Sequence, residues 1–274
     1  MIKKENDHPR INYRNSLKKI IEHEKEHWGE IFRLKLETGR KKPKKFSSFW
    51  DEDYYQKIKD YVNPLILKYN YSKLLEAGSG SGRASIILNK NIDKTMLDIS
   101  PAALQYSKHI AKIFKARNIS YVIGNIFGMP FDEKTFDFVW NLGVIEHYDI
   151  PDIKLIFSEM MRVTKENGIV TIGVPNFYSG PILKAWILKA PFFKFISGYR
   201  LDTEYFYDKR ILKDLLIYAA KTEGRKVEWI NSLYFGNPLP TEMPKPIIKT
   251  LGKLMDFLFP KNRFLILIVC KLTK

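Results

Sequence analysis

The chain has 274 residues and a net charge of +16, from 46 lysines and arginines against 30 acidic residues. Because 45% of the residues are hydrophobic and 14% aromatic, the chain can bury a substantial core, which excludes global disorder. Its single cysteine, Cys270, excludes an internal disulfide and a cysteine-based zinc cluster. The positive charge favours an anionic partner (nucleic acid, a membrane surface or a phosphorylated substrate), or else reflects a lysine-rich composition alone.

The first 70 residues are predicted to form a charged, helical extension. Residues 14–38 carry apolar side chains at loosely helical spacing, and the basic stretch Gly39–Lys45 is predicted to be a linker. A second helix is expected from Asp51 to Tyr69, because acidic residues favour a helix N-terminus. No apolar stretch follows the basic N-terminus, so we expect no signal peptide and a cytoplasmic location.

Strands and helices alternate from residue 73 onward. The predicted strands are Lys73–Ala77, Lys94–Asp98, Ile119–Gly124, Thr135–Asn141, Gly168–Val174, Lys226–Ile230 and Phe264–Leu272. The predicted helices are Arg83–Leu88, Pro101–Lys115, Ile153–Val163 and Asp208–Thr222, and a turn is expected at Lys165–Gly168. This alternation predicts a doubly wound α/β sheet that binds its ligand at the carboxyl ends of the strands.

A glycine cluster follows the first predicted strand, in the stretch L-E-A-G-S-G-S-G-R-A-S over residues 75–85. Glycine tolerates positive φ and lets another group approach the backbone, so Gly78, Gly80 and Gly82 favour a ligand cradle over a flexible turn. A dinucleotide fingerprint reads G-x-G-x-x-G. Here the third glycine comes one position early, and Arg83 stands where that pattern requires glycine.

Five phrases in order resemble the motifs of class I S-adenosylmethionine-dependent methyltransferases. They are E-A-G-S-G-S-G (76–82), L-D-I-S-P-A-A-L (97–104), G-N-I-F-G-M-P-F (124–131), F-D-F-V-W-N-L-G-V-I-E-H (136–147) and M-R-V-T-K-E-N-G (161–168). The chain is most similar to the broad group that contains quinone-biosynthesis and small-molecule methyltransferases. The resemblance implies a seven-stranded Rossmann-like sheet and S-adenosylmethionine as the cofactor.

The resemblance also implies which residues bind the cofactor. Asp98 accepts the ribose hydroxyls, and Asn125, where the family usually has aspartate, accepts from the adenine amino group beside Ile126. The remaining implied cofactor-binding residues are Glu76, Gly78, Ser79, Gly80, Gly82, Ile99, Asn141 and Tyr54. Tyr54 belongs to the aromatic stretch 47–55, which is interpreted either as a cofactor lid or as a hydrophobic dock for the N-terminal helix.

His147 is the candidate general base, since it follows the fourth strand at the rim where the acceptor is expected. The alternative is a role in packing and loop order. His23 and His27 lie four residues apart without an accompanying cysteine and are interpreted as a solvated helix face. Methyl transfer from a sulfonium needs no metal, and no cluster with metal-ligand spacing occurs in the sequence.

We predict two regions, an extension with a cofactor lid over 1–70 and a methyltransferase domain over 71–274. Within the domain, residues 176–206 interrupt the alternation and are predicted to be a lid over the acceptor, with Phe177, Tyr178 and Trp186 as apolar contacts. Trp186, Phe192, Phe193 and Phe195, with lysines between them, resemble a segment that lies in a membrane interface. The other interpretation is an ordinary lid buried on the domain.

The leading functional hypothesis is methyl transfer to an O, N or C atom of a small, apolar or lipid-like acceptor. An RNA or protein methyltransferase that uses the basic surface is the second. Nucleic acid is the less favoured partner, because Asn141-Leu142-Gly143-Val144 replaces the Asn/Asp-Pro-Pro-aromatic tetrad of many enzymes that methylate nucleic-acid amino groups. A third hypothesis is a regulatory subunit that binds the cofactor without catalysis.

Overall fold

A seven-stranded sheet forms the centre of the computed structural model, which describes residues 8–41, 44–190, 192, 201 and 204–273. The strand order is β3-β2-β1-β4-β5-β7-β6, and β7 runs antiparallel to both of its neighbours. The strands are β1 (Lys73–Ala77), β2 (Asp93–Asp98), β3 (Ile119–Ile123), β4 (Phe136–Leu142), β5 (Thr164–Pro175), β6 (Lys226–Phe235) and β7 (Leu265–Thr273). The predicted seven-stranded Rossmann-like fold is confirmed.

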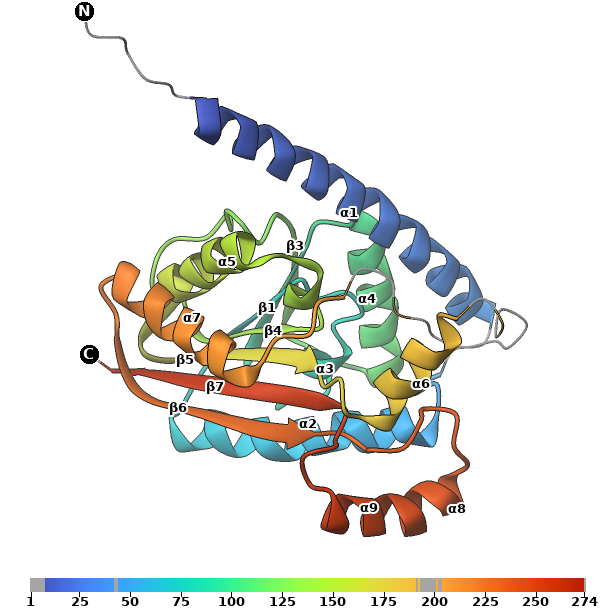
Figure 1. The fold of residues 1–274 in the computed structure, drawn as a ribbon. Coiled ribbons are helices and arrows are strands. Elements are labelled where there is room, and N and C mark those ends of the chain that lie inside the picture. The colour runs from blue at the N-terminus through green and yellow to red at the C-terminus, as the bar shows by residue number, and fades with distance from the viewer. Residues whose placement is uncertain (1–7, 42–43, 191, 193–200, 202–203, 274) are drawn as a thin grey trace, which may run out of the picture.

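Helices cover both faces of the sheet (Figure 1). They are α1 (His8–Lys41), α2 (Phe49–Lys68), α3 (Arg83–Ile86), α4 (Pro101–Phe114), α5 (Ile150–Val163), α6 (Gly180–Leu188), α7 (Lys209–Thr222), α8 (Lys245–Ile247) and α9 (Lys253–Leu258), with the short helices η1 (Ile145–His147) and η3 (Ile248–Gly252). Apolar side chains of α5 and α7 pack on one face of the sheet, and those of α2 and α3 pack on the other. No helix in the described ranges is long and apolar enough to span a bilayer.

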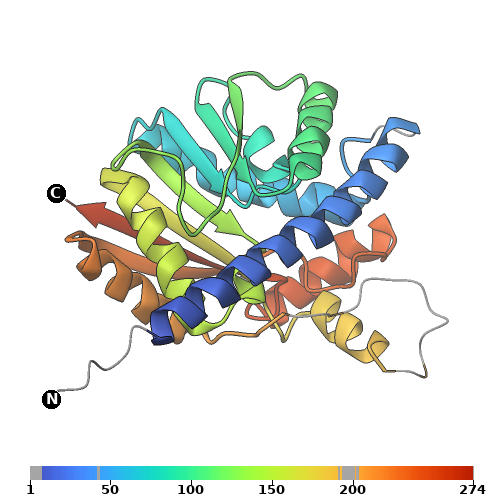
Figure 2. The same cartoon turned by 90° about the horizontal axis from the view of Figure 1, so that it is seen from above.

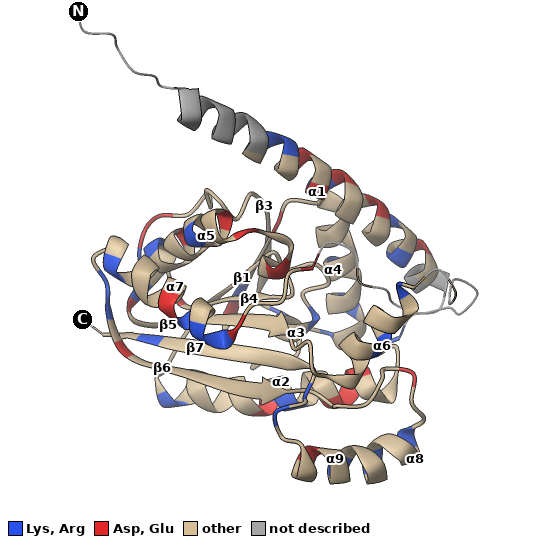
Figure 3. Ribbon diagram, in the orientation of Figure 1, with Lys and Arg blue, Asp and Glu red and all other residues tan. Residues whose placement is uncertain are grey.

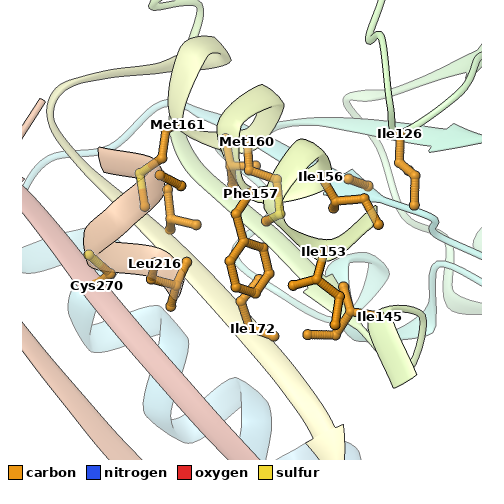
Figure 4. Packing of buried hydrophobic residues seen from close by; sticks show 14 of the residues in the cluster. Ile126, Ile145, Ile153, Ile156, Phe157, Met160, Met161, Ile172, Leu216 and Cys270 are labelled. Carbon is orange, nitrogen blue, oxygen red and sulfur yellow. The ribbon is translucent and has the colours of Figure 1, made fainter. Parts of the chain in front are cut away.

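The core under α5 follows directly from the sequence of that helix. The Asp149 side chain caps the helix by accepting from the Asp152 N–H at 3.1 Å. The apolar residues of α5 recur at helical spacing and point together at the sheet: Ile153, Ile156, Phe157, Met160 and Met161 (Figure 4). Phe157 is fully buried in the same cluster as Ile172 of β5 and Leu216 of α7. This packing fixes the sheet on the side away from α2.

Several elements are longer than predicted. The predicted linker Gly39–Lys45 is wrong at its start, because α1 continues to Lys41 and the first helix-breaking residue is Pro43. The turn expected at Lys165–Gly168 lies inside β5, where Asn167 takes a left-handed backbone conformation with φ of 59°. β6 continues to Phe235, and helix α2 runs through Pro64.

Two features of the arrangement have no counterpart in the sequence predictions. The long helix α1 crosses the molecule diagonally and packs against α4 (Figure 2). Residues 245–258 form a continuous helical segment, α8–η3–α9, at the end of the molecule where α6 also lies (Figures 1 and 2). Helix α1 lines the functional site, and the loop that leads into the α8–η3–α9 segment contributes Thr241 and Glu242 to it.

Candidate active site

A cavity of about 820 Å³ lies at the carboxyl ends of β1, β2 and β4. Its wall contains nine of the residues predicted to bind the cofactor, together with His147: Tyr54, Glu76, Gly78, Ser79, Gly80, Asp98, Ile99, Asn125 and Ile126. Parallel strands bring these segments to one edge of the sheet, as the alternation of strands and helices predicts. The volume is in the range of small-molecule and cofactor pockets.

The glycine loop after β1 is tightly folded against β2. Gly78, Gly80 and Gly82 all have positive φ, of 75°, 51° and 61°. The Gly78 and Ser79 N–H groups both donate to the Leu97 carbonyl, at 2.8 and 2.9 Å. A Cβ added to Gly78 would lie 2.8 Å from Val144 Cγ2, so a side chain at this position would collide with the loop after β4.

Two of the predicted cofactor-binding residues are absent from the described cavity wall. A Cβ added to Gly82 would lie 2.5 Å from the buried Ser107 Oγ of α4, so this glycine permits close packing of the loop on a helix. The Asn141 amide donates to the Ala77 carbonyl at 2.7 Å and ties β4 to β1. Both residues therefore support the cavity wall through packing and hydrogen bonding without lining it.

Asp98 holds the glycine loop and the start of α4 together. Its Oδ2 accepts from the Gly80 N–H at 2.8 Å, and its Oδ1 accepts from the Ser100 N–H at 2.8 Å. Burial raises the pKa of this carboxyl, and the backbone hydrogen bonds oppose that rise. Because each carboxylate oxygen has two acceptor positions, both oxygens can still accept a hydroxyl from a ligand.

Glu76 and Arg83 bring an acidic and a basic side chain to the cavity wall. Glu76 is buried, and its Oε2 has no hydrogen-bond partner among the described residues. Burial raises the pKa of Glu76 to about 8, and the nearby Asp98 adds to the rise. The Arg83 guanidinium lies 5.6 Å from the centre of the Tyr55 ring, and its Nε is buried without a hydrogen-bond partner in the described part of the chain.

Helix α1 covers the cavity. A Cβ added to Gly80 would lie 3.1 Å from Cζ of Phe32, so the Phe32 ring sits directly over the glycine loop. The Trp28 indole donates to Glu24 at 2.7 Å and meets the His147 ring edge-on at 5.5 Å between centroids. His147 therefore contacts the covering helix as well as lining the cavity.

Several further carboxyl groups line the cavity. Glu146 is buried beside His147, and its Oε2 finds no hydrogen-bond partner within the described ranges. Burial raises the pKa of Glu146 to about 8, and Glu204 contributes to the rise. Glu24 and Glu242 also line this cavity. The wall is completed by apolar groups, among them Ile31, Ile182 and Phe264.

Comparisons with known proteins agree with this geometry. Residues 75–172 match the family profile of the methyltransferase domain. This segment contains the glycine loop, Asp98 and all of β4. The chain is a class I S-adenosylmethionine-dependent methyltransferase.

The methyltransferase is similar to enzymes that act on different acceptors. It is 25% identical over 198 residues to the protein-lysine N-methyltransferase EFM4 of Saccharomyces cerevisiae, covering 62% of this chain and 86% of the relative. It is 28% identical over 130 residues to demethylmenaquinone methyltransferase of Staphylococcus aureus, covering 46% and 51%. Its fold matches magnesium protoporphyrin IX methyltransferase of Synechocystis with a TM-score of 0.57 at 13% identity, over 92% of this chain and 98% of that one.

The structure corrects two interpretations of the methyltransferase sequence. The helix face that carries His23 and His27 is solvated only in part. The His23 side chain is 72% exposed as predicted, whereas His27 is half-buried and its ring meets that of Trp28 at 5.3 Å; both residues line the cavity. No local signal distinguishes this face, because charged residues surround it on both sides. Sequence reasoning therefore missed the α1 wall, and it missed the buried Glu146 and the half-buried Arg83 at the site.

The predicted aromatic contacts of the lid are also wrong in part. Tyr178 is 74% exposed and Trp186 is 55% exposed, so both face solvent. From α6, the cavity wall takes Pro181, Ile182 and Lys184 instead. The reason is the helical period, because Ile182 and Ala185 form the buried face of α6 and Trp186 follows on the next face. Phe193 and Phe195 lie outside the described residues.

Tyr54 satisfies both interpretations of the stretch 47–55. Its ring is buried, stacks on Trp50 at 5.4 Å and lines the cavity. Trp50 donates its indole N–H to the Leu239 carbonyl at 2.9 Å, which docks the start of α2 on the loop after β6. Burial raises the pKa of Tyr54 well above its usual range, so its phenol is neutral and can donate a hydrogen bond.

Proposed function

We propose that the methyltransferase acts on a small acceptor with an apolar body. The observation that carries this proposal is the composition of the cavity wall beyond the glycine loop. There α1 contributes Trp28 and Ile31, and α6 contributes Ile182. Phe264, the residue before β7, also lines the wall. Such a wall excludes water and holds an apolar molecule by contact rather than by many hydrogen bonds.

The residues around the glycine loop fit the groups of S-adenosylmethionine. The two Asp98 oxygens suit the ribose hydroxyls, and the unpartnered Glu76 Oε2 suits the methionine ammonium. The Arg83 guanidinium is the cation for the methionine carboxylate. The Asn125 side chain stabilises the loop that carries it, because its Oδ1 accepts from the Phe127 N–H at 3.0 Å. An amide oxygen has a second acceptor position, which suits the adenine amino group.

When bound, the cofactor supplies an electrophilic methyl group on a sulfonium that is also its leaving group. The chain then has to hold the acceptor in line and keep water away, which is the contribution of the α1 wall. Where the acceptor atom must lose a proton, His147 is the proposed base. Its ring contact with Trp28 supports the packing role, and the two roles are compatible in one side chain.

A protein lysine is the second candidate acceptor. The similarity to EFM4 favours it, as do four carboxyl groups in the cavity wall: Glu24, Glu146, Glu204 and Glu242. These acids stand out in a chain of net charge +16 and would attract an ammonium group. The small-acceptor proposal is preferred because the apolar wall is continuous with the cofactor end.

The experiment that separates these candidates follows the methyl group. Purified enzyme and methyl-tritiated S-adenosylmethionine are added to a cell extract, which is then divided into solvent-extractable, small polar, protein and RNA fractions. We expect label in the solvent-extractable fraction, and much less of it with the Asp98→Ala variant. Label confined to protein would establish the lysine candidate in its place. Label in RNA that disappears with rising salt would establish nucleic acid.

Removing the Asp98 carboxylate is expected to weaken cofactor binding by about 1.5–3 kcal/mol, the scale of hydrogen bonds to a charged group. Asn125→Ala removes a neutral partner and is expected to cost about 0.5–1.5 kcal/mol. Isothermal titration calorimetry with S-adenosylmethionine measures both changes. A folded Asp98→Ala variant that binds as tightly as the wild type would contradict the ribose assignment.

A further inference from the structure

The helical segment α8–η3–α9 has an apolar stripe that faces solvent. Ile247, Leu251, Leu254 and Leu258 recur at helical spacing and are all exposed. Phe257 beside them is 82% exposed. The opposite side holds the segment on the body of the protein, since Ile248 is buried in the core cluster under α2. The stripe is thus a fixed surface rather than a frayed end.

The same segment is rich in lysine, and the acids near it are paired. Lys245 and Lys249 lie over the Phe49 ring of α2, at 5.0 and 5.7 Å from its centre, so the lysines follow a different face of the segment from the stripe. Residues 243–261 contain four lysines and one acid, Asp256, which gives a net charge of +3. Asp256 is bound by Lys57 at 3.4 Å and by Arg263 at 3.1 Å. Figure 3 shows the blue lysine positions along α8 and α9 with a single red one. An exposed apolar stripe on a helical segment whose polar face carries lysines is the pattern of helices that lie in the interface of an anionic bilayer.

Helix α6 lies at the same end of the molecule and has an exposed apolar face of its own (Figures 1 and 2). Its exposed face carries Leu183, Trp186 and Ile187. The loop at 237–242 joins the two segments, because the Gly180 N–H donates to the Pro238 carbonyl at 2.9 Å and Lys184 bridges to Glu242 at 2.8 Å. Both Lys184 and Glu242 also line the cavity. The exposed apolar surface therefore adjoins the cavity wall.

We propose that α6 and α8–η3–α9 form a docking surface for an anionic lipid bilayer. The apolar stripe and the indole of Trp186 enter the headgroup region, and Lys249 and Lys253 lie at the level of the lipid phosphates. The net charge of +3 over residues 243–261 is complementary to a negative surface. The inference goes beyond the proposed acceptor and does not depend on it, because vesicle binding is measured without methyl transfer.

The test is sedimentation of the full chain with vesicles of phosphatidylcholine, alone or mixed in equal parts with phosphatidylglycerol. Wild type is expected to bind the mixed vesicles at least about tenfold more tightly, and less tightly as salt rises. Leu254→Glu with Phe257→Glu is expected to lose about tenfold or more. Lys249→Gln with Lys253→Gln is expected to lose roughly fivefold for each lysine.

A matched control introduces two glutamates at exposed apolar positions outside the proposed docking surface. Leu67 and Ile123 are 67% and 62% exposed, so Leu67→Glu with Ile123→Glu changes charge and exposed apolar area without touching the surface. This variant is expected to bind vesicles like wild type. Equal binding by the Leu254→Glu and Phe257→Glu variant would overturn the proposal. The proposal would also be overturned if the wild type does not bind anionic vesicles and instead forms dimers through this surface.

A second measurement needs no charged substitution. Lipids brominated in the acyl chains are expected to quench Trp186 fluorescence on vesicle binding, and the Trp186→Phe variant is expected to lose most of that quenching while it still binds. Unchanged quenching in Trp186→Phe would show that α6 does not enter the bilayer. Cofactor affinity by calorimetry is expected to stay within about threefold of wild type in every variant, which separates this surface from the cofactor site.

Discussion

Gly82→Ala is expected to lower the free energy of unfolding by about 2–5 kcal/mol. The left-handed backbone, with φ of 61°, costs about 1–2 kcal/mol for a residue with a Cβ. The new Cβ would also lie 2.5 Å from Ser107 Oγ and 3.1 Å from Met96 Sδ, and overpacking of this kind costs about 1–3 kcal/mol. Urea denaturation monitored by circular dichroism measures the change.

Gly224→Ala is the matched control. Gly224 has φ of 63°, but a Cβ there meets nothing within 4 Å, so only the backbone strain of about 1–2 kcal/mol is expected. Adding Ser107→Ala to Gly82→Ala is expected to recover part of the lost stability, because it removes the Ser107 Oγ that the new Cβ would contact. If Gly82→Ala instead unfolds like the control but loses cofactor affinity, Gly82 contacts the cofactor and the packing role is wrong.

The alternation of strands and helices in the sequence predicts the sheet well, because residues that end a strand follow each of its first strands. β1 and β2 match their predicted ranges within one residue at each end, since a glycine loop and a capped helix follow them. The helical segment at 245–258 escapes prediction because Pro244, Pro246 and Gly252 read as breakers. Pro246 is tolerated near the start of the helical segment, and Gly252 lies against Asn237, where a Cβ would come within 2.8 Å.

The cofactor end of the site could be predicted better than the acceptor end, for a physical reason. Glu76, Gly78 and Asp98 lie within 23 residues of sequence and are placed by the ends of two adjacent strands. The acceptor end is assembled from distant segments, with Trp28 from α1 and Ile182 from α6 meeting the loop after β4. Such contacts depend on how α1 crosses the domain, and no short-range pattern specifies that angle.

The second large effect is expected from pH. Glu76 and Glu146 hold their protons in the folded chain up to about pH 8, because burial raises the pKa of each to about 8. In the unfolded chain such a group loses its proton near the ordinary glutamate pKa of 4.5. Between these two values the folded state binds more protons than the unfolded state, so the free energy of unfolding falls as the pH rises.

Each of the two groups is expected to lower the free energy of unfolding by about 1.4 kcal/mol per pH unit in this window. Across the whole window this amounts to a few kcal/mol for each group. Glu146→Gln removes one of them and keeps the shape of the side chain. Its unfolding free energy is therefore expected to fall less steeply than that of wild type between about pH 5 and pH 8. Above pH 8 the variant is expected to be the more stable protein, because no charge has to be buried at that position.

Denaturant titrations of both proteins across this pH range give the comparison directly. Titrating groups elsewhere contribute equally to wild type and Glu146→Gln, so the difference between the two curves isolates Glu146. Glu52→Gln, a change of the same charge at an exposed position of α2, is expected to run parallel to wild type. Parallel curves for Glu146→Gln would mean that Glu146 is ionised in the folded chain, and that a cation or a rearranged loop compensates its charge inside the cavity.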